Sequence, residues 1–136
     1  MSGPEPPDPA QREEVELWLQ RAAEDVAGAS FLVQESYALP ASFHTQQALE
    51  KLLKALLIRA RQDIRRTHDL DALASEARRF WPTLIPAPFP LVNITHWYLP
   101  SRHPDADDAP PGLKEIAEAL AEIRDLLSAV GTQLGL

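Results

Sequence analysis

The stretch from Ser42 to Leu57 constrains the fold most. At helical period its apolar residues cover more than half of the helix circumference: Ala48, Leu49, Leu52, Leu53, Ala55, Leu56 and Leu57. A helix that is apolar nearly all round must be buried among other helices. Ser42 is predicted to be its N-cap, because a serine hydroxyl there accepts a hydrogen bond from an otherwise unpaired N–H of the first turn. We expect the other segments to pack around this central helix.

Two long segments on either side have amphipathic helical patterns. The first starts at Asp8-Pro9, with aspartate as N-cap and proline in the first helical position, and is expected to end near Tyr37. Pro40 separates it from the central helix, which predicts an antiparallel hairpin. The last segment spaces its apolar residues 3-4-3-4-3-4: Leu113, Ile116, Leu120, Ile123, Leu127, Val130 and Leu134. This is an a/d seam, and we favour its packing within the bundle over packing against a second subunit.

Shorter helices are predicted between these segments. Thr67 resembles the N-cap of a helix that stops before Phe80, and residues 91–99 suggest another short helix between proline-rich loops. The chain has 13 prolines and 5 glycines, and no alternating apolar run that reads as a strand. We therefore predict an all-α, up-and-down bundle of about five helices, with a disordered tail at residues 1–8 and one helical domain at residues 9–136.

Several function classes lack support in the sequence. Without cysteine there is no thiolate metal site, and the four histidines share no helix face with metal-ligand spacing, so no metal or cofactor is expected. No phosphate-loop or dinucleotide-binding motif is present. The net charge of −7 argues against broad attraction to nucleic acid. With no secretory signal and no apolar run long enough for a membrane, we expect a cytoplasmic protein.

Two polar groups of residues are candidates for a site. The first lies at the end of the central helix and comprises Arg59, Arg61, Arg65, Arg66 and His68. It is either a solvated helix end, which we favour because cations are favourable at a helix C-terminus, or a phosphate-binding patch.

The second group is the loop at residues 101–108, where Arg102 and His103 stand among aspartates. It is either a stiff charged connector or a site. A site would use Arg102 to hold a phosphate and a histidine to move a proton, because guanidinium matches phosphate geometry and imidazole titrates near neutral pH.

Three blocks, in this order, resemble the HEPN family (higher eukaryotes and prokaryotes nucleotide-binding). They are F-H-T-Q-Q-A-L-E-K-L-L-K-A at residues 43–55, T-H-D-L at 67–70 and Y-L-P-S-R-H-P-D at 98–105. The resemblance implies a helical bundle, usually a symmetric dimer, that is often paired with a small nucleotidyltransferase in a toxin–antitoxin module. Many HEPN proteins are metal-independent endoribonucleases with an R-x(4–6)-H motif near the start of the last helix, and others only bind nucleotides or RNA.

The nuclease motif is incomplete in this chain. Arg102 occupies the arginine position, but the histidine positions hold Asp107, Asp108 and Ala109. His103 adjoins Arg102 and would have to take over the missing role.

Three functions remain open from the sequence. The leading hypothesis is a dimeric HEPN module that binds a nucleotide, RNA or a nucleotidyltransferase without strong catalysis, through side chains that include Gln47, Lys51, Lys54, His68 and Asp105. The first three fall on the polar strip of the central helix, which is equally explained by contact with water or another subunit. The alternatives are an endoribonuclease that uses Arg102 and His103, and a non-catalytic interaction scaffold that uses the seam of the last helix.

Overall fold

The computed structural model describes residues 6–64, 69–87, 89, 91, 94, 97 and 111–136. These residues contain four α-helices and no strand: α1 (Pro9–Gln34), α2 (Ala38–Arg59), α3 (Leu70–Phe80) and α4 (Leu113–Leu134). The predicted all-α class is confirmed. The fifth predicted helix, at residues 91–99, lies mostly outside the described residues, as do residues 1–5 of the predicted tail.

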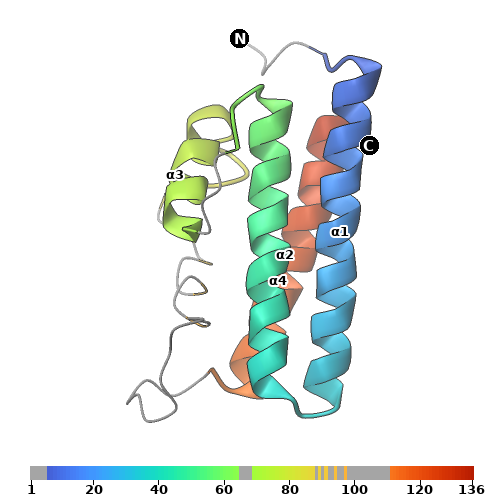
Figure 1. The fold of residues 1–136 in the computed structure, drawn as a ribbon. Helices are drawn as coiled ribbons and strands as arrows, with labels where there is room; N and C mark the ends of the chain where they lie inside the picture. The colour runs from blue at the N-terminus through green and yellow to red at the C-terminus, as the bar shows by residue number, and fades with distance from the viewer. Residues whose placement is uncertain are drawn as a thin grey trace.

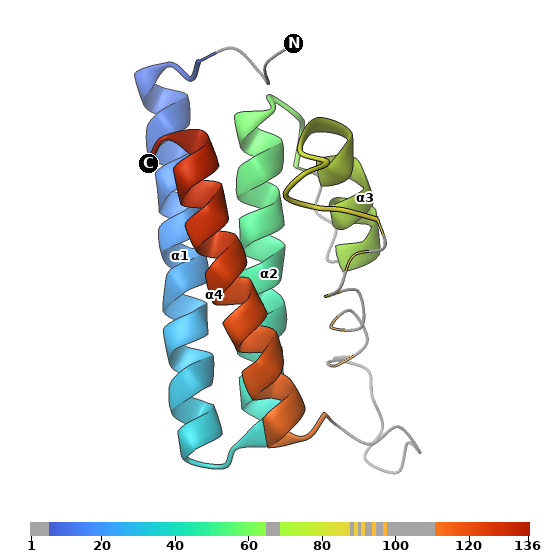
Figure 2. The same ribbon diagram turned by 180° about the vertical axis from the view of Figure 1, so that it is seen from behind.

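The three long helices form an up-and-down bundle. α1 and α2 are an antiparallel hairpin, and α4 lies against both of them (Figures 1 and 2). Because α4 runs in the same direction as α2, its end returns to the start of α1, where the Arg12 guanidinium donates a hydrogen bond to the Gly135 carbonyl at 3.3 Å. The shorter α3 packs beside the C-terminal half of α2.

α2 is the central helix that the sequence predicts. It contacts all three other helices, and its apolar side chains between Ala48 and Leu57 are at most 2% exposed. Such complete burial gives about 1.5–3 kcal/mol per large aliphatic side chain relative to exposure. The helix therefore fixes the position of every polar group that it carries.

The predicted start of α2 is wrong. The helix begins at Ala38, and Pro40 lies inside its first turn, where the missing N–H costs nothing because first-turn N–H groups have no helical partner. Ser42 is consequently not the N-cap: it is buried, and its hydroxyl donates to the Leu39 carbonyl at 2.7 Å.

The end of α1 is also earlier than expected, at Gln34 rather than near Tyr37. Ser36 adopts a left-handed conformation (φ 65°) that stops the helix. The N–H of Ser36 then bonds to the Val33 carbonyl at 3.0 Å, and that of Tyr37 to the Leu32 carbonyl at 2.8 Å. This is the Schellman arrangement, in which a glycine usually holds the left-handed position. The N-cap prediction for Asp8 is confirmed, since its carboxylate accepts from the Gln11 N–H at 2.7 Å.

α3 is capped by Asp69 and not by Thr67 as predicted. The Asp69 carboxylate accepts from the N–H groups of Asp71 and Ala72 at 3.0 and 3.2 Å. An ionised cap also interacts favourably with the positive end of the helix dipole, which explains the preference for aspartate here. The helix includes Phe80, one residue beyond the predicted stop, and the following Trp81 is anchored to α2 through its indole N–H.

The seam of α4 packs inside the chain. Ile116, Leu120, Ile123 and Val130 are at most 2% exposed and belong to the same core as α2. The predicted helix and its intramolecular packing are both confirmed. The scaffold hypothesis thereby loses the apolar surface on which it was based.

Candidate functional site

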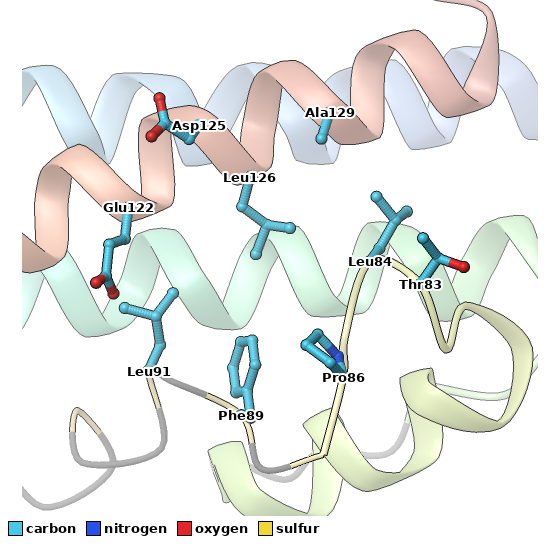
Figure 3. A pocket seen from close by; sticks show the side chains of 9 residues that line it. All are labelled: Thr83, Leu84, Pro86, Phe89, Leu91, Glu122, Asp125, Leu126 and Ala129. Atoms are coloured by element: carbon cyan, nitrogen blue, oxygen red, sulfur yellow. The ribbon is translucent and has the colours of Figure 1, made fainter.

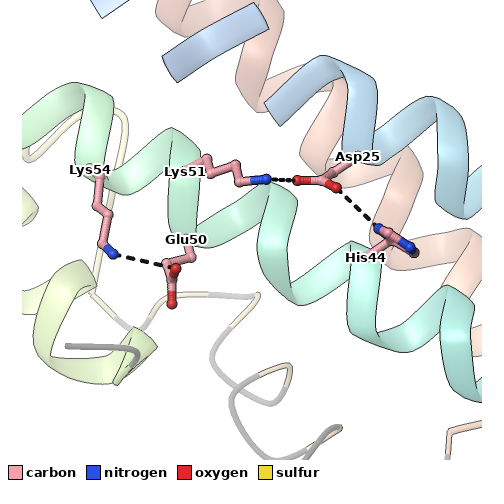
Figure 4. Close-up of polar contacts among 5 residues, drawn as sticks. All are labelled: Asp25, His44, Glu50, Lys51 and Lys54. Carbon is pink, nitrogen blue, oxygen red and sulfur yellow. Dashed lines mark hydrogen bonds and ion pairs between the residues drawn. The ribbon is translucent and has the colours of Figure 1, made fainter. Parts of the chain in front are cut away.

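The polar strip predicted on α2 is divided between two ion-paired groups (Figure 4). In the first group, Lys51 forms an ion pair with Asp25 of α1, and Nδ1 of His44 lies 3.1 Å from the other carboxylate oxygen of Asp25. The Asp25 side chain is 13% exposed and those of Lys51 and His44 are 25% and 39% exposed. One carboxylate thus holds two basic groups at the boundary between α1 and α2.

The second group is more deeply buried. Nζ of Lys54 lies 3.4 Å from Oε2 of Glu50, and the two side chains are only 9% and 7% exposed. The ammonium also lies 5.8 Å from the centre of the Trp18 ring, which a cation can contact favourably. Because buried charges are tolerated when they are paired, Lys54 contributes to the packing of α1 on α2. With 9% of its side chain exposed and a carboxylate beside it, Lys54 is a poor candidate for contact with a phosphate.

The side of α2 that remains partly exposed carries His44, Gln47 and Lys51. These residues follow one another at helical steps of three and four, which places them on one face. The Gln47 side chain makes no hydrogen bond with any described residue and is half-buried. Two basic groups and an amide beside one carboxylate can contact a phosphate or a nucleobase edge. His44 on this face and its partner Asp25 on α1 were not among the predicted site residues, although the step of three from His44 to Gln47 indicates the first.

Gln46 connects α2 to the segment that leads toward Arg102. Its side-chain amide donates to the Ile94 carbonyl at 2.5 Å, and both residues are buried. A buried amide that bonds a backbone carbonyl satisfies that carbonyl and holds Ile94 against α2. Ile94 and Trp97 are themselves core residues.

The arginine cluster at the end of α2 is only partly a solvated helix end. Arg61 is exposed, but Arg59 is 9% exposed, which corrects the favoured interpretation for that residue. Burial, and secondarily the charge of Arg61, lower the pKa of the Arg59 guanidinium below its ordinary value. Arg65, Arg66 and the predicted binding residue His68 lie outside the described residues.

Arg102, His103 and Asp105 also lie outside the described residues, so their predicted roles remain predictions. Within the described part of the chain, no three histidine, aspartate or glutamate side chains are arranged to hold a metal ion. None of its helices combines the length and apolarity that crossing a membrane requires.

A family model described as HEPN domain matches residues 15–133. The chain belongs to the HEPN family. The match begins in α1 and ends in α4, so it includes the central helix, the paired groups on it and the segment around Arg102. Searches of curated proteins and of solved structures gave no significant match.

HEPN membership confirms the resemblance seen in the three sequence blocks and supports a nucleotide- or RNA-related module in general. In this HEPN domain the first block lies within α2. Its two adjacent glutamines have different environments: Gln46 is buried against Ile94, and Gln47 lies on the partly exposed face. The block therefore carries one positioning residue and one candidate contact residue.

Proposed function

We propose that this HEPN protein binds a nucleotide or RNA without strong catalysis of its own, and that it acts with a small nucleotidyltransferase in a toxin–antitoxin type system. One observation carries the proposal. Arg102 is present at the arginine position of the nuclease motif, while the three positions for the histidine hold Asp107, Asp108 and Ala109.

The chemistry of these residues separates binding from catalysis. The guanidinium of Arg102 forms paired, charge-assisted hydrogen bonds to a phosphate at any ordinary pH. Strand cleavage also needs a group that gives or takes a proton near neutral pH, a task suited to histidine. An ionised aspartate at position 107 or 108 instead repels the phosphate. The remaining motif favours retention of a ligand over its cleavage.

The face of α2 supports a secondary role for His44, Gln47 and Lys51 in contacting the ligand. Lys51 is already paired with Asp25, so a phosphate gains less from it than from an unpaired cation. We therefore expect Arg102 to contribute more to binding than Lys51, and Lys54 to contribute only through packing.

The test measures cleavage and binding on the same set of proteins. Wild type, Arg102→Ala and Lys51→Ala are incubated with a mixed RNA pool in EDTA, and their affinity for labelled RNA and for nucleotides is measured in parallel. Arg21→Ala, a change at an exposed arginine of α1, is the matched control for loss of one positive charge. We expect no cleavage by any of them. Loss of Arg102 should weaken binding by about ten-fold or more, the value of one charge-assisted hydrogen bond, with smaller effects for Lys51 and none for Arg21.

A restoration experiment isolates the missing histidine. Asp107→His, Asp108→His and Ala109→His are each assayed for metal-independent cleavage, alone and combined with Arg102→Ala. We expect at least one single variant to gain cleavage that depends on Arg102. Cleavage by the wild type that disappears in both Arg102→Ala and His103→Ala would overturn the proposal in favour of the endoribonuclease alternative.

The partner and the homodimer are tested separately. Tagged protein recovered from its own cells should carry a nucleotidyltransferase in stoichiometric amount, identified by mass spectrometry, and the purified chain should have the mass of a dimer in light scattering. A stoichiometric complex without a nucleotidyltransferase would contradict the partner. A monomer at all accessible concentrations would contradict the homodimer.

A further inference from the structure

A cavity of about 420 Å³ opens between α4 and the loop that follows α3 (Figure 3). Its size falls in the range of pockets that bind ligands or protruding side chains. One wall is formed by loop residues and the other by α4: Thr83, Leu84, Pro86, Phe89, Leu91, Glu122, Asp125, Leu126 and Ala129.

The floor of the cavity is apolar and held in place. Phe89 and Leu91 are 7% and 5% exposed and belong to the core. Leu84 and Leu126 are half-buried and pack against that core. A partner side chain that entered would therefore meet fixed hydrocarbon surface, and burying apolar area there is favourable.

The opposite wall is fixed by an arginine of α3. The Arg78 guanidinium donates to the carbonyls of Ile85 and Pro86 at 3.1 and 3.2 Å. These bonds tie the loop to α3, so the cavity exists before any ligand binds, and preorganisation lowers the cost of binding. They also direct this guanidinium to the backbone of the loop.

The rim on the α4 side is acidic. Glu122 and Asp125 lie one helical turn apart, and Glu118 extends the same stripe by another turn. Neither Glu122 nor Asp125 makes a hydrogen bond or ion pair with any described residue. Arg124, between them in sequence, contacts Ser30 of α1 instead. The cavity thus combines an apolar interior with two carboxylates whose charge is not neutralised by the described residues.

We propose that this cavity is a docking site for a basic segment of a partner protein, which inserts one or two apolar side chains and places lysine or arginine against Glu122 and Asp125. Helical segments commonly bind in this way, with apolar anchors in a groove and charges at its edge. The acidic rim repels phosphate, so RNA and nucleotides are unsuitable occupants. The docking site is therefore independent of the nucleotide- or RNA-binding function proposed above.

The test uses a defined probe and matched variants. Binding of a short fluorescein-labelled helical peptide of lysine and leucine, with leucines at i, i+3, i+4 and i+7, is followed by fluorescence anisotropy. A peptide with glutamate in place of lysine tests the charge, and a scrambled lysine–leucine peptide tests the pattern. The rim is neutralised in Glu122→Gln/Asp125→Asn. Glu13→Gln/Glu14→Gln, at two exposed positions of α1, makes the same change in net charge away from the cavity.

We expect the lysine–leucine helix to bind the wild type and the α1 control equally, and the rim variant about ten-fold more weakly, as the loss of two exposed ion pairs implies. Ala129→Leu, at an exposed helical position that lines the cavity, should fill it and abolish binding while helix content stays unchanged. Peptide-induced NMR shifts should centre on Thr83 and Ala129.

Equal weakening by the rim and control variants would show general charge attraction and overturn the proposal. So would equal binding of the scrambled or glutamate peptide, or no binding of the lysine–leucine helix. Self-association of the wild type that Ala129→Leu abolishes would assign the cavity to a second copy of this chain instead. None of these outcomes depends on RNA binding or on Arg102.

Discussion

Replacing Ile123 by alanine tests whether the apolar seam of α4 is core or a surface for a second chain. The Ile123 side chain is 0% exposed within a single chain. The change removes three buried carbon atoms at about 0.8 kcal/mol each, which gives about 2.4 kcal/mol of lost transfer free energy. The cavity left in the core adds to this, so the free energy of unfolding should fall by about 3–4 kcal/mol.

Urea unfolding followed by circular dichroism measures the loss. The urea midpoint should fall with little change in the slope m. The loss of unfolding free energy caused by the substitution should be the same at low and high protein concentration. Ser128→Ala, at an exposed position of the same helix, should change stability by less than about 0.5 kcal/mol. A loss for Ile123→Ala of under about 1 kcal/mol, or one that appears only at concentrations where the chain is oligomeric, would refute the assignment of the seam to the core.

Three further changes test local features of the fold, each by urea unfolding. Ser36→Gly should raise the free energy of unfolding by about 0.5–1 kcal/mol because glycine adopts the left-handed conformation without strain. Ser75→Gly inside α3 should lower it by a similar amount. A decrease in both variants would contradict the left-handed conformation of Ser36. Asp8→Ala should cost about 1 kcal/mol, and Asp8→Ser should recover most of it; equal losses would exclude a capping role. Glu50→Ala should lower the free energy of unfolding by about 3 kcal/mol because it leaves Lys54 buried without this carboxylate. Glu50→Leu/Lys54→Met should lower it by less, because both charges are removed together. A larger decrease in the double variant would show that the ion pair stabilises the fold by itself.

Helix positions could be predicted where the chain signals them locally. The spacing in α4 predicts both its length and its buried side, because steps of three and four residues define one face of a helix. Asp8-Pro9 indicates the start of α1, since each residue is favourable at its position for a reason that does not depend on the rest of the fold. The burial of α2 follows from an apolar surface too wide for a helix exposed on one side.

Helix ends without such signals could not be predicted. α1 and α2 both end in a left-handed residue that is not glycine, Ser36 and Arg61, and their strain is offset by the backbone bonds that they permit. For α2, the N–H groups of Arg61 and Gln62 bond to the carbonyls of Ile58 and Leu57 at 2.9 Å. Neither Ser36 nor Arg61 is a residue type that usually takes the left-handed position, so the sequence offers no local sign of these ends. Pro40 led to the wrong predicted start of α2 because proline is allowed inside the first turn of a helix.

For the candidate site too, the sequence indicates which face of a helix a residue lies on, but not which residues of other helices contact it. The pattern of α2 places Gln47, Lys51 and Lys54 on one polar strip, but it does not reveal that Lys51 pairs with Asp25 on another helix. A helical pattern assigns a polar residue to a face, and the neighbouring helix decides whether that face meets water or a carboxylate. The two lysines of the strip are paired with carboxylates of the same chain, so they are less available to a phosphate.

The pairing of these lysines is the reason that the proposed function assigns the main phosphate contact to Arg102. A protein of net charge −7 that binds an anion, as proposed, needs a local concentration of positive charge. On the polar strip of α2 the two candidate lysines are paired, Lys51 with Asp25 and Lys54 with Glu50. The residue that matches the HEPN motif is thus our candidate for the principal phosphate contact, and the α2 face is proposed only as a secondary one. If Lys51→Ala weakened RNA binding more than Arg102→Ala, that order would be reversed, and the ligand would have to displace Asp25 in order to bind.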